Sequence, residues 1–183
     1  MPETEYEIGA TRRDEFYAIM EMTRRAAVFN ETEVDTVTEL LEGYEEGPAI
    51  SGYNFLSCRQ VARPERSGSG SKDQRNVESS QEARPGQVIG YACWGPRELS
   101  GNGYDLYWIC ADPAVHSRGV GRALMSAVED QIRKRHGVWL VIETSDTAHY
   151  APARRLYERC GYTLAMLLQD FYKDGDGMCT YTK

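Results

Sequence analysis

The spacing of apolar residues predicts four helices, because side chains three and four positions apart share one face of a helix. The second helix has a clear start: Asn30 is a good N-cap, and Glu33 three residues later completes a capping box. Pro152 suits the first turn of the last helix, and Gly161 suits its C-cap. The predicted helices cover residues 14–29, 31–44, 119–136 and 152–160.

Short runs rich in Val, Ile, Tyr and Phe predict strands between and after these helices. The run VWLVIE at 138–143 is almost continuously apolar, as expected of a strand covered on both faces. Strands and helices mix without strict alternation, so we expect an α/β (α+β) fold with one mixed, mostly antiparallel sheet flanked by four helices. The predicted strands are 5–8, 53–62, 87–94, 104–111, 138–143, 163–172 and 178–181.

One polar segment, residues 63–86, stands apart from the rest. It reads RPERSGSGSKDQRNVESSQEARPG, and Val77 and Ala83 are its only apolar residues. Such a stretch buries too little surface to offset its ordering entropy, so it predicts a mobile loop. The strands on either side look like the two arms of one β-hairpin. We therefore expect a single domain over 1–183 with an insertion in that hairpin.

Composition and charge narrow the function. The net charge is −7, from 28 acidic against 21 basic side chains, which argues against a nucleic-acid binder. No apolar run approaches the roughly 20 residues that span a bilayer, and the acidic N-terminus lacks a signal-peptide pattern. Five scattered cysteines and three histidines show no metal-binding spacing. We expect a cytoplasmic protein with reduced thiols, no metal and no membrane partner.

The stretch ADPAVHSRGVGRALM at 111–125 predicts a phosphate-binding turn. An apolar strand ends there, and a turn with Gly119 and Gly121 leads into a helix whose start favours an anion. Arg118 and Arg122 add positive charge. A Rossmann motif would need a third glycine at Leu124, and a P-loop would need Gly-Lys-Ser/Thr. The alternative is a tight turn whose arginines face solvent.

Two motifs in the second half of the chain resemble the GNAT superfamily of N-acetyltransferases. The stretch from His116 to Gly121 is similar to the family's pyrophosphate motif, with His116 in place of the usual Gln or Arg. ARRLYERCGY, from Ala153 to Tyr162, is similar to its second signature. The sequence DFYKDGD at 170–176 also resembles a bacterial subset of these proteins.

The resemblance implies a GNAT fold and an acetyl-CoA site. In that fold the sheet has about six to seven strands, and the fourth and fifth splay apart to admit the thioester. Here those strands are 104–111 and 138–143. Backbone groups of the first would bind the pantetheine arm like an added strand, and the glycine turn would hold the pyrophosphate. The implied cosubstrate-binding residues are Ile109, Cys110, Ala111, Ser117, Arg118, Gly119, Val120, Gly121 and Arg122.

Amine acetylation needs a group that removes a proton and a group that assists the departing thiolate. Tyr157 matches the family tyrosine that approaches the CoA sulfur, which implies the acid role; its alternative is a helix tyrosine packing on the core. Glu143 is the first charged residue after VWLVI, at the strand end near the splay. A partly buried carboxylate there would have a raised pKa and accept a proton, directly or through water. Its alternative is a solvated strand-end glutamate.

Three further residues are weaker candidates for a role in binding or catalysis. Tyr150 stands where many relatives have an asparagine, and it binds CoA, binds the acceptor or covers the core. His116 fits a CoA contact or a solvent-facing position better than a catalytic base. Cys110 is not expected to be a nucleophile, because the family transfers the acyl group directly and the residue looks buried in a strand.

The leading hypothesis is therefore an acetyl-CoA-dependent N-acetyltransferase that acts on a primary amine of a small molecule. Two alternatives stay open: acetylation of a protein or peptide, and a non-catalytic acetyl-CoA-binding sensor. A homodimer through the C-terminal strands is also compatible with the sequence.

Overall fold

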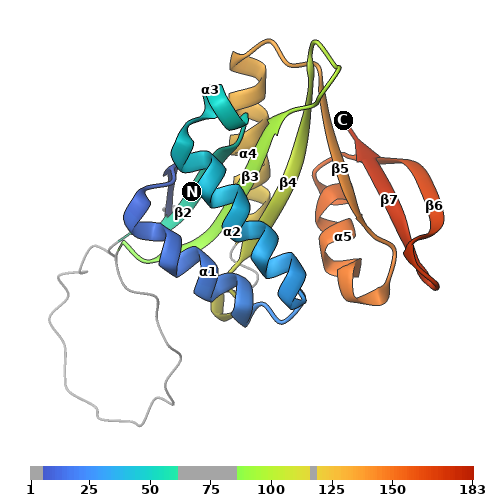
Figure 1. Ribbon diagram of the computed structural model, residues 1–183, viewed down its shortest axis with the longest axis horizontal. Coiled ribbons are helices and arrows are strands. Elements are labelled where there is room, and N and C mark those ends of the chain that lie inside the picture. The colour runs from blue at the N-terminus through green and yellow to red at the C-terminus, as the bar shows by residue number, and fades with distance from the viewer. Residues whose placement is uncertain (1–5, 62–85, 116–118) are drawn as a thin grey trace, which may run out of the picture.

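Within the part of the chain that the structure describes, seven strands form one sheet with helices on both faces (Figure 1). The computed structural model describes residues 6–61, 86–115 and 119–183. The strands are β1 (Tyr6–Ala10), β2 (Asn54–Gln60), β3 (Val88–Pro96), β4 (Gly103–Ala111), β5 (Trp139–Ser145), β6 (Thr163–Lys173) and β7 (Asp176–Thr182). The helices are α1 (Phe16–Arg25), α2 (Glu31–Glu46), α3 (Pro48–Ser51), α4 (Val120–Lys134) and α5 (Ala151–Arg159).

The strand order is β1-β2-β3-β4-β5-β7-β6, and every neighbouring pair is antiparallel except β4 and β5. The predicted mixed, mostly antiparallel sheet is therefore confirmed. Its four longer helices are those predicted, and α3 adds a single turn.

The parallel strands β4 and β5 are paired over only four positions. The pairing runs from Gly103 opposite Trp139 to Leu106 opposite Ile142. Beyond that point β4 continues to Ala111 and β5 to Ser145, but no pairing between them is present in the described part of the chain. The expected splay between the fourth and fifth strands is confirmed.

Two apolar cores hold the helices against the sheet. On one face α4 and α5 pack on the strands through side chains such as Leu124, Val128 and Tyr157. On the other face α1 and α2 contribute Ile19, Met22, Val37 and neighbouring residues, which cover Phe55, Tyr91 and Cys110. Figure 1 shows α1 and α2 in front of the first half of the sheet, α4 behind it, and α5 beside β5 and β7.

The helix predictions were accurate at α2 and too long at α1. The Asn30 side chain accepts a hydrogen bond from the backbone N–H of Glu33, and the Glu33 carboxylate accepts one from the backbone N–H of Asn30, so the capping box is confirmed. Helix α1 ends at Arg25 instead of residue 29. Ala27 has a φ of 54°, in the left-handed region that does not continue a helix, and Phe29 instead packs on Trp108.

The hairpin of β2 and β3 is also confirmed. Its ends are joined by hydrogen bonds from Gln60 N to Gln87 O (2.9 Å) and from Gly86 N to Gln60 O (2.7 Å). The insertion predicted at 63–86 lies outside the described residues, apart from Gly86. No helix in the described ranges has the length and apolar character needed to cross a membrane.

Candidate active site

The parting of β4 and β5 leaves one edge of β4 free. Asp112 N donates to Ile89 O of the β3 side at 2.9 Å. Because backbone groups alternate in direction along a strand, those of Ile109 and Ala111 point away from β3, toward the side that β5 has left. The backbone of Cys110 points toward β3. Of the three residues predicted to bind the pantetheine arm, Ile109 and Ala111 therefore have the suitable orientation.

A β-bulge in β4 determines which face each side chain takes. Cys93 is opposite Trp108 and Trp94 is opposite Leu106, so Tyr107 is an extra residue. After it, Ile109 and Ala111 contact the core under α4 and α5, whereas Trp108 and Cys110 contact the core under α1 and α2. Burial raises the pKa of the Cys110 thiol to about 12, with the nearby Asp112 adding to it. A buried, protonated thiol agrees with the expectation that Cys110 is not a nucleophile.

The predicted phosphate turn leads into the N-terminus of α4. Gly119 is the N-cap with a φ of 77°, a conformation that glycine adopts without strain. Val120 is buried beneath it, and Arg122 is exposed. A Cβ on Gly121 would lie 3.0 Å from Leu156 of α5, so the helix start is packed closely. His116, Ser117 and Arg118, which were also predicted here, lie outside the described residues.

These features fit the pyrophosphate and pantetheine of acetyl-CoA. The first turn of a helix carries backbone N–H groups without intrahelical partners and a partial positive charge. Along the chain, this helix start comes after the free stretch of β4 and the short 3-10 turn Pro113–Val115. Figure 1 shows β4 and α4 in the same half of the sheet. Among the described residues there is no cluster of His, Cys, Asp and Glu side chains that would hold a metal ion.

Tyr157 lies on the α4 and α5 face of the sheet. It is 5% exposed, and its ring packs 5.8 Å from that of Tyr181 and 6.5 Å from that of Tyr162. Burial first, and then the neighbouring Tyr181, raise the pKa of Tyr157 above its ordinary value. The phenol is thus a hydrogen-bond donor throughout the neutral range. Both expectations, a catalytic acid and a core tyrosine, are compatible with this position.

Glu143 lies on the opposite face, at the point where β4 and β5 part. It is the first residue of β5 after the paired stretch, and it is opposite Thr180 of β7. Its side chain is 41% exposed, so it is more open than the partly buried carboxylate we expected. The side-chain alternation of β5 separates it from Ile142, which points into the core that contains Tyr157.

Two charged residues beside Glu143 were not identified from the sequence. Arg97, in the turn after β3, contacts Asp105 of β4 (Nη1–Oδ1 2.5 Å) and Glu143 (Nη2–Oε1 3.5 Å). Burial raises the pKa of Asp105, although the ion pair with Arg97 opposes that rise. These contacts depend on the register of β4 against β5, which cannot be predicted from a local sequence pattern.

Tyr150 joins two segments on the Glu143 side of the sheet. Its hydroxyl donates to Glu33 of α2 at 2.5 Å, and its ring lies 6.5 Å from that of Phe29. Phe29 in turn packs 5.0 Å from Trp108. This position favours the acceptor or core role for Tyr150 over a contact with CoA. Burial raises the pKa of Tyr172 nearby, and the charges of Glu143, Asp176 and Glu33 raise it further.

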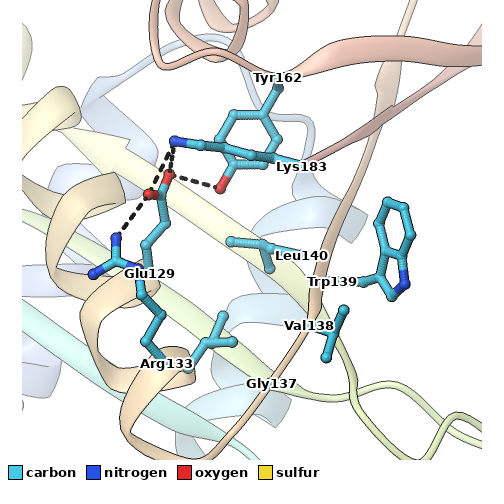
Figure 2. Close-up of a pocket in the computed structure, with 9 residues that line it drawn as sticks. Glu129, Arg133, Gly137, Val138, Trp139, Leu140, Tyr162 and Lys183 are labelled. Carbon is cyan, nitrogen blue, oxygen red and sulfur yellow. Dashed lines mark hydrogen bonds and ion pairs between the residues drawn. The ribbon is translucent and has the colours of Figure 1, made fainter.

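A separate cavity of about 160 Å³ lies at the other end of β5 (Figure 2). Its polar groups are paired with one another: Glu129 accepts hydrogen bonds from Lys183 (2.9 Å) and Tyr162 (3.1 Å). Val138 and Trp139 form an open apolar side. Because this cavity is at the paired end of β4 and β5, away from the splay, we do not assign it to the active site.

Comparison with known proteins agrees with this arrangement. The family model for the acetyltransferase (GNAT) domain matches residues 78–164. A GNAT-family protein from Desulfovibrio desulfuricans has a similar structure, with a TM-score of 0.79 and 28% sequence identity over 97% of this chain and 98% of that one. The yncA protein from Salmonella typhimurium, solved with acetyl-CoA, has the same fold, with a TM-score of 0.68 and 20% identity over 98% and 93% of the two chains.

Among curated proteins, the [ribosomal protein bS18]-alanine N-acetyltransferase of Escherichia coli strain K12 is 36% identical over 75 residues. That match covers 39% of this chain, and the chain spans about half (47%) of the length of this relative. With the fold, the splay and the two motifs, these findings establish the class. The chain belongs to the GNAT superfamily of acetyltransferases.

Proposed function

We propose that the protein transfers the acetyl group of acetyl-CoA directly to a primary amine. The observation that carries this proposal is the position of Glu143, a carboxylate at the point where β4 and β5 part. The helix start suited to the pyrophosphate follows the same free stretch of β4. Tyr157 lies across the sheet from Glu143, so an acid and a base would approach the thioester from opposite faces.

In the proposed reaction, the amine attacks the thioester and CoA leaves as the thiolate. The amine nitrogen bonds to the thioester carbonyl carbon, and the C–S bond breaks. The Glu143 carboxylate accepts the proton that the amine loses, directly or through water, and the Tyr157 phenol donates a hydrogen bond to the departing sulfur. The products are an amide and CoA. In this assignment Ile109, Ala111 and the α4 start hold the cosubstrate, and Tyr150 belongs to the acceptor side.

We propose a small molecule as the acceptor. Its amine would approach from the face of α1 and α2, where the charges of Glu143, Asp176 and Glu33 all raise the pKa of Tyr172. These carboxylates suit a cation, and Phe29 and Trp108 provide an apolar wall. The hydrogen bond between Tyr150 and Glu33 ties the α2 start to the segment before α5, which supports a narrow site.

A second acceptor class has specific support. The E. coli relative is named as acting on an alanine of a ribosomal protein, and it matches this chain over 75 residues. Peptides with N-terminal alanine therefore belong in any acceptor screen.

We further propose that two copies of the chain associate through β6. This strand is at the edge of the sheet, and its side chains are exposed on both faces. Residues 163–169 carry no charge, so an antiparallel pair of β6 strands would bring no like charges together.

The test is thiol release from acetyl-CoA with a panel of small amines, amino acids and alanine-terminated peptides. Glu143→Gln should lose roughly 10²-fold or more in kcat while still binding acetyl-CoA. Glu42→Gln, at an exposed position on α2, is the control and should keep full activity. Binding of acetyl-CoA with no turnover of any acceptor would favour a sensor. Failure to bind acetyl-CoA would overturn the proposal.

A further inference from the structure

Two carboxylates share one arginine at the splay. Asp105 is opposite Val141 in the parallel pair, and side chains opposite each other lie on the same face of a sheet. Glu143, two residues after Val141, is on that face as well. Arg97 reaches both carboxylates, with distances of 2.5 Å to Asp105 and 3.5 Å to Glu143.

Arg97 is well anchored for such a role. Its backbone N donates to Gly103 O at 2.9 Å, which closes the turn between β3 and β4. Gly103 is the first residue of β4 that pairs with β5. The guanidinium is therefore supported by the same hairpin that carries Asp105. The pair with Asp105 is the more protected one, because that side chain is 19% exposed whereas Glu143 is 41% exposed.

Resting on the acetyltransfer role of Glu143, we propose that Arg97 is a positioning residue that keeps Asp105 and Glu143 ionised side by side and directs the Glu143 carboxylate toward the acceptor amine. An opposite charge favours the ionised form of a carboxyl group, and a neighbouring carboxylate disfavours it. Without Arg97, one of the two groups takes up a proton at a higher pH. The free carboxylate needed for proton transfer is then lost on the acid side.

Other charged and titratable groups near Glu143 do not replace Arg97. Tyr172 of β6 is near enough for the charges of Glu143, of Asp176 on β7 and of Glu33 on α2 to raise its pKa. Tyr107 lies beside Asp105. All of these are acidic or neutral, so Arg97 is the cation that contacts Glu143 among the described residues.

The experiment compares Arg97→Gln, Arg97→Lys, Asp105→Asn and the double variant Arg97→Gln/Asp105→Asn in pH profiles of kcat/KM for the acceptor. Arg97→Gln should lose about ten- to a hundredfold near neutral pH, recover as the pH rises, and leave the KM for acetyl-CoA unchanged. Arg97→Lys should recover part of the rate. The double variant should move the acid limb back toward wild type, because the second carboxylate is gone.

A purely structural role for Arg97 would lower kcat equally at every pH, and that result would overturn the proposal. The proposal would also be overturned if Asp105→Asn lost most of its kcat while Glu143→Gln kept its activity, because Asp105 would then be the base. A measurement that does not require turnover distinguishes the positioning role of Arg97 from the proposed acetyl transfer. Carboxyl ¹³C shifts followed against pH should show that the pKa of Asp105 is higher in Arg97→Gln than in the wild type. An unchanged pKa of Asp105 would contradict the positioning role even if the protein is an active enzyme.

Discussion

At the scale of single residues, the site depends on the different surroundings of two proton-carrying groups, the Tyr157 phenol and the Glu143 carboxylate. Tyr157 is enclosed by other tyrosines, and its burial keeps the phenol protonated. Glu143 is open to solvent and faces a cation. The two groups differ in environment because alternate residues of β5 point to opposite faces: Ile142 points into the core that contains Tyr157, and Glu143 points to the other face. One strand thus separates a buried donor from an exposed acceptor.

We expect Tyr157→Phe to lower kcat by roughly 10²-fold while leaving acetyl-CoA affinity intact, because the substitution removes only the hydroxyl. Tyr181→Phe is the control: it removes a hydroxyl from an adjacent buried ring, one that donates to Glu158 at 3.1 Å. Since the pKa of Tyr157 is raised above its ordinary value of 10.0, its ionisation should cause no loss of rate up to pH 10 in the wild type. Stopped-flow thiol release across pH measures both. Equal losses in the two variants would contradict the acid role.

Glu15 and Arg59 form a buried ion pair between the segment before α1 and strand β2. The guanidinium contacts both carboxylate oxygens, at 2.5 and 2.9 Å, and the two side chains are 7% and 6% exposed. Burial acts to raise the pKa of Glu15, but the hydrogen bonds from Arg59 and from the backbone of Arg12 outweigh it, so the pKa is lowered.

A carboxyl group with a lowered pKa stabilises the fold above its ordinary value of 4.5, and this contribution is lost as the pH falls through the folded-state pKa. Glu15→Gln should therefore lower the free energy of unfolding by about 3 kcal/mol at pH 7 and by much less in acid. Denaturant titrations at both pH values measure the difference. Glu21→Gln removes an exposed ion pair with Arg24 and should change little. An equal loss at pH 7 and in acid would show that the ion pair is not the cause.

At the scale of elements, the α4 start is the part of the site that sequence alone describes best. A strand, a glycine turn and a helix follow one another along the chain, so their geometry is local. The capping box of α2 is equally local, and it was predicted residue by residue. By contrast, the cluster of Arg97, Asp105 and Glu143 requires the β4–β5 register. The early end of α1 requires the contact between Phe29 and Trp108, which belongs to the tertiary fold.

Gly119→Ala should weaken acetyl-CoA binding and destabilise the fold by roughly 1–2 kcal/mol, because a residue with a Cβ is strained at a φ of 77°. The cause would be conformation and not a clash, since among the described residues the atom nearest to the added Cβ is Tyr6 Oη, at 3.8 Å. Gly101→Ala is the control, because no atom of the described part of the chain lies within 4 Å of its Cβ and its φ is not positive. Calorimetric titration with CoA and thermal unfolding report the two effects. Comparable behaviour of both variants would show that the α4 start does not depend on this conformation.

At the scale of the whole molecule, the sheet consists of two parts joined by four residue pairs. Strands β1 to β4 carry α1, α2 and α4, whereas β5 to β7 carry α5 (Figure 1). The core shared by α4 and α5 spans both parts on one face and holds them together beyond the splay. On the other face, α1 and α2 cover only the first part. The second part is left open there, and this opening is where we expect an acceptor to enter.

The same division leaves β6 at an uncovered edge, where Leu167 is 45% exposed. If two copies pair along β6, Leu167→Lys would place two ammonium groups in the middle of the interface. They would repel each other and would lose their hydration there. We therefore expect the wild type to sediment at about twice its chain mass of 20.7 kDa and Leu167→Lys at the single-chain mass. Leu99→Lys, the same change at a fully exposed leucine in the turn between β3 and β4, should leave the dimer intact. Sedimentation velocity over a concentration series measures this mass. A wild type that stays at the single-chain mass would show that β6 does not pair with a second copy. The bulges of β6 would then be what protects this edge from association.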